Sequence, residues 1–271
     1  MTRQAFLKLC SLLLAGSALP FAAKIPKATM PALFFGHGSP MNIIQNNDYT
    51  NMLKQTAKQI PNPLAILIIS AHWEENDTLL STTGDTQTIY DFGGFPQALY
   101  EVDYAAKGSQ YLASMLNIKT TNRGLDHGAW SILTHMYPNA NIPTMQLSIN
   151  RSLSLEEHFM LGKRLESLRA HSVLIIGSGS ITHNLRSRDG NAENAAKTFD
   201  SFVKKTILSN DLQMLTTPIH ANIPLWDVHP TLEHYIPLLY IAGIASVSQN
   251  HKFIFEGFQD TVISMRAWLI E

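Results

Sequence analysis

The 271-residue sequence contains little cysteine and little charge. Cys10 is its single cysteine, so the chain can form neither a disulfide framework nor a cysteine-rich zinc site. Charged residues make up 15% of the chain, and 20 basic and 21 acidic side chains give a net charge of -1. Nucleic acid is not an expected partner, because no broad basic field exists to hold a phosphate backbone. A bound metal ion would have to be held by carboxylates or by some of the 11 histidines.

Several nucleotide and hydrolase motifs are also missing. The sequence has no G-x-x-x-x-G-K-[ST] segment, which would cradle phosphates, and no G-x-S-x-G segment, which would present a nucleophilic serine. Gly177 and Gly179 follow an apolar run, as in a dinucleotide-binding loop, but Thr182 replaces the third glycine of that motif. These absences disfavour nucleotide binding and α/β-hydrolase chemistry.

The N-terminal segment 1–23 is typical of an export signal. Arg3 and Lys8 precede an apolar run over 9–23, whose 15 residues fall short of the roughly 20 that span a bilayer. Residues 2–8 resemble a twin-arginine signal, except that Gln4 stands in place of the second arginine. We therefore expect export to the periplasm and no integral membrane span in the mature protein. The alternative is a cytoplasmic protein with an uncleaved N-terminal helix.

The rest of the chain, 30–271, is expected to form one domain. Continuous apolar runs predict strands buried on both faces, and apolar residues at three- and four-residue spacing predict helices between them. The strands are expected at 32–35, 64–69 and 173–176, with further candidates at 142–149 and 252–258; the helices are expected at 48–60, at 155–169 and from Pro230 onward. The alternation predicts an α/β fold, with a central, largely parallel or mixed sheet covered by helices.

Three histidines follow the three apolar runs. His37, His72 and His183 each come just after a predicted strand, and a fourth candidate is either His229 or His234. Ligands of open parallel sheets bind at the carboxyl ends of the strands, so these imidazoles are expected to meet at that edge. Convergent neutral imidazoles suit Zn, Fe, Cu or Ni. The pattern predicts a metal site at the C-terminal edge of the sheet.

The remaining histidines fall in other contexts. His127 opens a helical stretch over 129–136, and an imidazole near a helix N-terminus can donate a hydrogen bond to an oxygen anion. The other histidines lie in polar or helical segments, so we expect them to be surface or packing residues. They are His135, His158, His171, His220 and His251.

Six segments of the sequence together resemble one known family. They occur at 36–41 (GHGSPM), 70–73 (SAHW), 91–100 (DFGGFPQALY), 125–130 (LDHGAW), 182–186 (THNLR) and 230–235 (PTLEHY). The same segments, in this order, are found in the DODA-type extradiol aromatic ring-opening dioxygenases, the 4,5-DOPA dioxygenase group of the class III, LigB-like enzymes. The resemblance extends from about residue 30 to the end of the chain.

The resemblance implies a single α/β domain and one divalent metal ion, held by His37, His72 and His234. His183 then corresponds to a further active-site histidine, either a metal ligand or an acid/base beside the metal, and His229 becomes a supporting residue. Fe(II) is the ion expected for dioxygenase activity, and Zn(II) is an alternative bound ion. The implied partners are O2 and a small aromatic diol, a DOPA-like catechol that is opened to a semialdehyde.

The mechanism expected for such chemistry needs groups that move protons. We assign this role to His183, with His127 stabilising the developing oxygen anion and Asp126 orienting a neighbouring imidazole. The segment 91–100 is expected to form an aromatic wall over the substrate ring. Competing hypotheses are a zinc-dependent hydrolase and a non-catalytic metal-binding protein of the envelope. The protein is expected to be a monomer or a small homo-oligomer.

Overall fold

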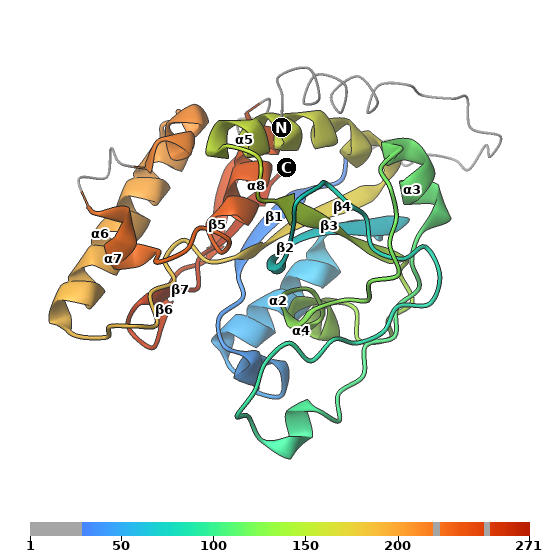
Figure 1. Ribbon diagram of the computed structural model, residues 1–271, viewed down its shortest axis with the longest axis horizontal. Helices are drawn as coiled ribbons and strands as arrows, with labels where there is room; N and C mark the ends of the chain where they lie inside the picture. The colour runs from blue at the N-terminus through green and yellow to red at the C-terminus, as the bar shows by residue number, and fades with distance from the viewer. Residues whose placement is uncertain (1–28, 219–222, 247–249) are drawn as a thin grey trace.

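A computed structural model describes residues 29–218, 223–246 and 250–271 (Figure 1). The predicted export signal at 1–23 and His220 lie outside the described residues. Among the described residues, no helix combines the length and the hydropathy that crossing a bilayer requires.

The core of the fold is a six-stranded mixed sheet. The strand order is β3-β2-β4-β1-β8-β5, formed by Thr144–Asn150, Ala65–Glu75, Val173–Gly179, Ala32–Gly36, Ala267–Ile270 and His251–Phe255. The four strands β3, β2, β4 and β1 run parallel, whereas β8 is antiparallel to both β1 and β5. A separate short hairpin consists of β6 (Phe258–Gln259) and β7 (Ile263–Ser264). The prediction of an α/β fold with a largely parallel or mixed sheet is confirmed.

Helices cover both faces of this sheet (Figure 1). The helices α5 (Leu155–Leu165) and α8 (Ile236–Ala245) pack on one face, and α2 (Asp48–Gln59) and α4 (His127–Met136) cover the other. The remaining helices, α3 (Gln110–Leu116), α6 (Gly190–Leu208) and α7 (Leu225–Val228), add buried side chains to the same core cluster as α5 and α8. Short 3-10 helices occur at Pro40–Ile43, Gln97–Leu99, Glu166–His171 and Leu212–Thr216.

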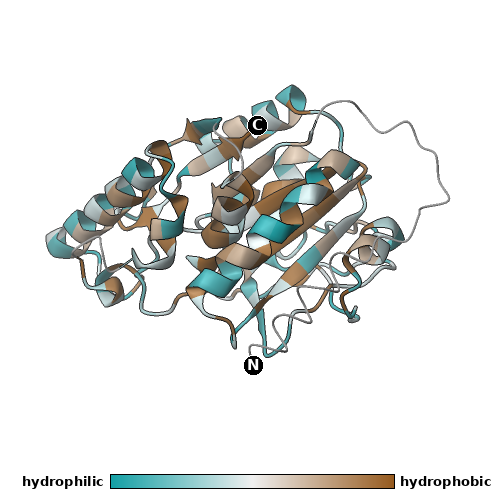
Figure 2. Cartoon of the chain, turned by 90° about the horizontal axis from the view of Figure 1, so that it is seen from above, coloured by the Kyte–Doolittle hydropathy of each residue, from teal (hydrophilic) through white to brown (hydrophobic). Residues whose placement is uncertain are grey.

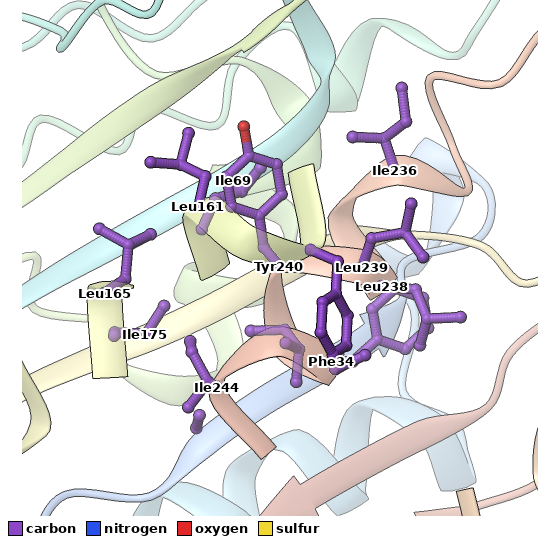
Figure 3. Close-up of a cluster of buried hydrophobic side chains, with 14 of the residues drawn as sticks. Phe34, Ile69, Leu161, Leu165, Ile175, Ile236, Leu238, Leu239, Tyr240 and Ile244 are labelled. Atoms are coloured by element: carbon purple, nitrogen blue, oxygen red, sulfur yellow. The ribbon is translucent and has the colours of Figure 1, made fainter. Parts of the chain in front are cut away.

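The two-sided burial explains why the strands are continuously apolar. Along β1, Phe34 faces the α5–α8 layer and Leu33 and Phe35 face the α2–α4 layer, because successive strand side chains point to opposite faces. Figure 3 shows Phe34 and Ile175 of the sheet among side chains of α5 and α8. In Figure 2, the hydrophobic colour is concentrated on the strands at the centre of the molecule.

Some predicted boundaries differ from the structure. The helix expected at 155–169 ends as α5 at Leu165 and continues as a 3-10 helix, and the strand expected at 252–258 covers 251–255. The prediction of a helix from Pro230 is wrong, because α8 begins only at Ile236 and places Pro237 in its first turn, where a missing N–H costs nothing. Residues 230–235 instead form turns that bring His234 to the sheet edge.

Histidines assigned to packing or to the surface have ordinary partners. His158 is fully buried, and its Nδ1 atom lies 3.1 Å from the hydroxyl of Tyr240. His135 Nε2 donates to the carbonyl oxygen of Asn42 at 2.8 Å, and His251 Nε2 lies 3.1 Å from Asn210 Oδ1.

Candidate metal centre

Five imidazoles gather at the C-terminal edge of the parallel strands. His37 follows β1 directly, His72 lies near the end of β2, and His183 follows β4, so the convergence expected from sequence is present. His234 precedes α8, and His127 is the first residue of α4. The rings of His37, His72 and His234 are mutually close, with centroid separations of 5.1, 5.4 and 5.0 Å.

A serine on the neighbouring strand fixes the tautomer of His37. The β1–β4 register places Ser178 opposite Phe35, and its Oγ atom lies 2.9 Å from His37 Nδ1. Because the Ser178 hydroxyl donates to the carbonyl oxygen of Gly128 at 2.5 Å, His37 Nδ1 must be the donor toward Ser178. The lone pair of His37 is therefore on Nε2, which lies 3.2 Å from Nε2 of His72.

Asp91 holds two of the histidines. Its Oδ2 atom lies 3.4 Å from His72 Nδ1, and its Oδ1 atom lies 2.9 Å from His127 Nδ1. The backbone N–H of His127 also donates to Oδ1, at 2.9 Å. Burial alone would raise the pKa of Asp91, but the hydrogen bonds and charge of His127, together with His72, outweigh it and lower the pKa to about 2. The carboxylate is thus ionised and lies against the Nδ1 side of both rings.

Asp126 does not have the orienting role expected from sequence. It is fully buried, accepts hydrogen bonds from Ser70 Oγ and Gln146 Nε2, both at 2.7 Å, and caps α4 through the backbone N–H of Ala129. Its oxygens are occupied by this network, and Asp91 contacts the imidazoles instead. Asp91 lies in a segment without helical or strand periodicity. Its position in the 91–100 motif was therefore the only sequence signal that it could belong to the site.

His234 is held from both its backbone and its ring. Its carbonyl oxygen accepts the backbone N–H of Ser180 at 2.8 Å, and a Cβ atom on Gly179 would lie 2.2 Å from that oxygen, so only glycine permits this approach. On the ring, Nδ1 lies 2.9 Å from Glu233 Oε1. The opposite nitrogen, Nε2, is buried and has no hydrogen-bond partner. His229, in contrast, donates from Nε2 to the carbonyl oxygen of Ile181 at 2.6 Å.

This donor set fits a divalent cation. Burial, followed by the proximity of other imidazoles, lowers the pKa of His37 and of His234 well below the ordinary value. The same causes lower the pKa of His72 to about 3. The three rings are therefore neutral near pH 7, and their Nδ1 atoms face Ser178, Asp91 and Glu233 respectively. A metal ion would satisfy the partnerless Nε2 atom of His234 and separate the two close Nε2 atoms of His37 and His72.

Two separate groups of side chains have metal-binding geometry. Nitrogens of His37, His72 and His127 lie within 4.8 Å of one another, and so do ligand atoms of His183, Glu233 and His234. The first group includes His127, which the sequence analysis did not count among the ligands. The geometry therefore offers two candidates, His127 and His234, for the third position beside His37 and His72.

His183 lies beside the cluster in a different orientation. Its ring stacks on that of His234, with a centroid separation of 3.5 Å and an interplanar angle of 7°. Its ligand atom also lies within 4.8 Å of those of Glu233 and His234. Burial lowers the pKa of His183, and its backbone N–H donates to the Val228 carbonyl at 2.8 Å. Both roles that the family resemblance implies for His183, metal ligand and acid/base, fit this position.

A cavity of about 270 Å³ opens onto the imidazoles. Phe95 from the 91–100 segment lines it, whereas Phe92 packs behind, with its ring centroid 5.5 Å from His127 and 5.2 Å from Tyr100. The predicted aromatic wall is thus represented at the cavity by Phe95, and the other aromatic rings of the segment support it. Leu185 also lines this space, which is large enough for a single-ring ligand.

A mixed α/β sheet with imidazoles at its carboxyl edge is an arrangement typical of metal-dependent enzymes. The family model described as the catalytic LigB subunit of aromatic ring-opening dioxygenase matches residues 31–263. The chain therefore belongs to the LigB family of aromatic ring-opening dioxygenases. Membership identifies it as an enzyme of the extradiol ring-cleaving type, as the sequence motifs predicted.

Individual relatives agree with this assignment. A 4,5-DOPA dioxygenase extradiol of Escherichia coli K12 is 36% identical over 258 residues, which cover 87% of this chain and 93% of the relative. A protein of the same name from Beta vulgaris is 36% identical, with 85% and 92% covered. A crystal structure of an uncharacterized E. coli K12 protein has a TM-score of 0.75 and 32% identity, and covers 89% of this chain and 100% of that chain.

Proposed function

We propose that the protein is a metal-dependent extradiol dioxygenase that opens the ring of a DOPA-like catechol with O2 to give a semialdehyde. The names of the relatives support the ring-opening chemistry and the DOPA-like substrate. The observation that carries the proposal is the cluster of His37, His72 and His234, whose ring centroids lie 5.1, 5.4 and 5.0 Å apart at a cavity lined by Phe95.

We assign one divalent ion per chain to His37, His72 and His234. Three protein ligands leave open positions for substrate and O2, as ferrous oxygenases require. Fe(II) would supply the redox chemistry and the Lewis acidity that favours catechol ionisation. Zn(II) would suit the same imidazoles but lacks redox chemistry, so it is the ion expected in an inactive preparation.

The proton movements are assigned to two histidines. His183, with its lowered pKa, is neutral near pH 7 and can accept a proton from a catechol hydroxyl, then return it as the ring opens. His127, whose ring lines the cavity with Nδ1 2.9 Å from the Asp91 carboxylate, is assigned to stabilise an oxygen anion that develops on the substrate.

Oxygen consumption tests the proposal directly. The protein, loaded anaerobically with Fe(II), is mixed with air-saturated catechols, including DOPA and protocatechuate. We expect stoichiometric O2 uptake and a yellow semialdehyde product with at least one of them. His183→Gln should lower kcat by about 10²–10⁴, the usual contribution of a general acid–base. His251→Gln, a histidine outside the cluster, should retain activity.

The alternatives give distinct results in the same assay. A zinc-dependent hydrolase would cleave ester or amide substrates without consuming O2, and a metal-binding envelope protein would do neither. Full turnover by His183→Gln would remove this residue from the chemistry. A lack of O2 uptake with every catechol and either ion would overturn the proposed activity.

A further inference from the structure

The mouth of the cavity has two opposite charges that the proposed chemistry does not use. Arg188 and Asp260 line the same space as His183. Arg188 Nη2 and Asp260 Oδ2 are 3.3 Å apart, and the two side chains are 53% and 44% exposed. Both charges therefore remain available to a molecule in the cavity.

Folding stability does not account for this pair. An exposed ion pair gains little free energy, because water screens the charges and two long side chains must be ordered. The pair between Arg266 and Asp200 differs, since both side chains are only 6% exposed and the aspartate also accepts from Ser264 Oγ. The Arg266–Asp200 pair is a structural element, whereas the Arg188–Asp260 pair is placed on the wall of a binding cavity.

The position of Asp260 is fixed relative to the imidazole cluster. Asp260 and Thr261 turn the β6–β7 hairpin, and their φ angles of 50° and 64° lie in the left-handed region, which is unusual for a β-branched threonine. The preceding residue, Gln259, accepts the backbone N–H of Ser39 through Oε1 at 2.7 Å. This bond ties the hairpin to the loop that follows His37. A strained turn next to a cavity is a feature associated with function.

We propose that Arg188 and Asp260 recognise the side chain of the substrate as an α-amino acid zwitterion. Arg188 binds the carboxylate, for which its planar guanidinium is suited, and Asp260 binds the ammonium group. The proposal rests on the proposed function, in which the diol end of the same molecule faces the histidines. It adds two specificity-determining residues, and no bond is formed or broken at them.

The paired charges explain why a zwitterion is favoured. An α-amino acid has a positive and a negative group on one carbon, so it satisfies both residues at once. A side chain with only a carboxylate leaves Asp260 as a repulsive neighbour, and one with only an ammonium group leaves Arg188 in that position. The pair therefore selects for the zwitterion and against either single charge.

Binding to the Zn(II)-loaded protein tests this assignment without turnover. Dissociation constants are measured calorimetrically for DOPA, dopamine, 3,4-dihydroxyphenylpropionate and 4-methylcatechol. Arg188→Gln should raise the dissociation constants of DOPA and of the propionate about tenfold, the loss expected for one charge-assisted hydrogen bond. The same substitution should lower the dissociation constant of dopamine. Asp260→Asn should raise the dissociation constants of DOPA and dopamine by the same factor and lower that of the propionate. Binding of 4-methylcatechol should stay unchanged in both.

The variants are chosen to keep the fold intact. Asparagine tolerates the left-handed backbone of residue 260, so Asp260→Asn removes the charge without adding strain. Lys197→Gln is a matched control, because Lys197 is 55% exposed and pairs with Glu193 on α6, outside the cavity lining. This control should leave all four dissociation constants at their wild-type values.

The results separate the inference from the proposed function. Equal effects of a charge variant on all four ligands, or no effect on any, would overturn the recognition role. So would wild-type protein that binds DOPA no more tightly than 4-methylcatechol. Failure of the proposed function has a different signature: the ligand pattern is present, but the Fe(II)-loaded protein consumes no O2 with DOPA.

Discussion

At the scale of single residues, each candidate ligand is defined by what its second nitrogen contacts. Ser178, Asp91 and Glu233 occupy the Nδ1 atoms of His37, His72 and His234 and leave the Nε2 atoms facing the cluster. Positions after strands predict His37 and His72 as ligands, and the family resemblance adds His234, but neither identifies Asp91, Ser178 or Glu233 as their partners. Ser178 and Asp91 come from segments remote from His37 and His72, so no local pattern reveals them, whereas Glu233 directly precedes His234.

The identity of the third ligand can be decided by metal content. We expect His234→Ala to lose most of the bound metal, because its buried Nε2 has no hydrogen-bond partner and its ring lies 5.4 and 5.0 Å from those of His37 and His72. His127→Ala should retain metal and lose activity. Elemental analysis after equilibration with one equivalent of Fe(II) or Zn(II) gives the answer, with His251→Ala as control. The reverse pattern would place His127 in the coordination sphere, as the geometry of its group with His37 and His72 allows.

Asp91 is expected to control metal affinity through His72. Asp91→Asn keeps the shape of the side chain but removes the negative charge that faces two imidazoles. Loss of such a supporting carboxylate typically weakens metal binding by about 10–100-fold. Competition with a chelator of known affinity measures the change. An unchanged affinity would show that the contacts of His72 with Asp91 do not influence coordination.

Acid should destabilise the protein partly through His158. Burial lowers the pKa of this histidine from 6.5 to about 4, so between these values the unfolded chain binds a proton that the folded chain does not. The protonation of His158 therefore does not affect the free energy of unfolding above pH 6.5. As the pH drops from 6.5 toward 4, it lowers the free energy of unfolding by at most about 1.4 kcal/mol per pH unit. Urea unfolding of wild type and His158→Gln at pH 7 and pH 5 measures it. The variant should show the smaller pH dependence; equal slopes would contradict the assignment.

At the scale of elements, the end of β4 and the segment before α8 are placed together by a glycine. Gly179→Ala would put a Cβ atom 2.2 Å from the carbonyl oxygen of His234, which is backbone and has little room to move. We expect a loss of about 1–3 kcal/mol in the free energy of unfolding, together with weaker metal binding.

Gly190 offers the matched control for this substitution. A Cβ atom there has no neighbour within 4 Å, and the residue is the first of α6. Gly190→Ala should therefore leave stability unchanged or raise it slightly. Thermal and urea unfolding of both variants compare the two positions. If Gly179→Ala were as stable as Gly190→Ala and bound metal normally, the contact between residue 179 and the His234 carbonyl oxygen would matter neither for stability nor for the metal site.

Five of the six strands of the main sheet and the helices α2, α4 and α5 could be predicted, whereas β8, α3, α6, α7 and the start of α8 were not. Apolar runs such as 173–176 identify β4, because burial on both faces leaves no polar positions. Pro230 and Pro237 both suit a first helical turn, and the sequence does not distinguish them. The structure uses Pro237, since 230–235 is needed to carry His234 to the sheet edge. For the same reason, His234 was preferred over His229 only through the family resemblance.

At the scale of the whole molecule, the destination of the protein is still a prediction from residues 1–23. We propose export to the periplasm with cleavage after Ala23, because a basic start precedes a short apolar run and small residues. Mass spectrometry of the native protein should find Lys24 at the N-terminus, and fractionation should find activity in the periplasm. An intact chain that begins at Met1 in the cytoplasmic fraction would contradict both expectations.

The position of β8 has a consequence for how the protein is made. β8 (Ala267–Ile270) pairs with β1, so the first strand of the sheet finds its antiparallel neighbour among the last residues of the chain. While the polypeptide is still on the ribosome, β1 has an unprotected edge, which is a hazard for association between nascent chains. His37, which follows β1, therefore reaches its final environment only after β8 has been synthesised.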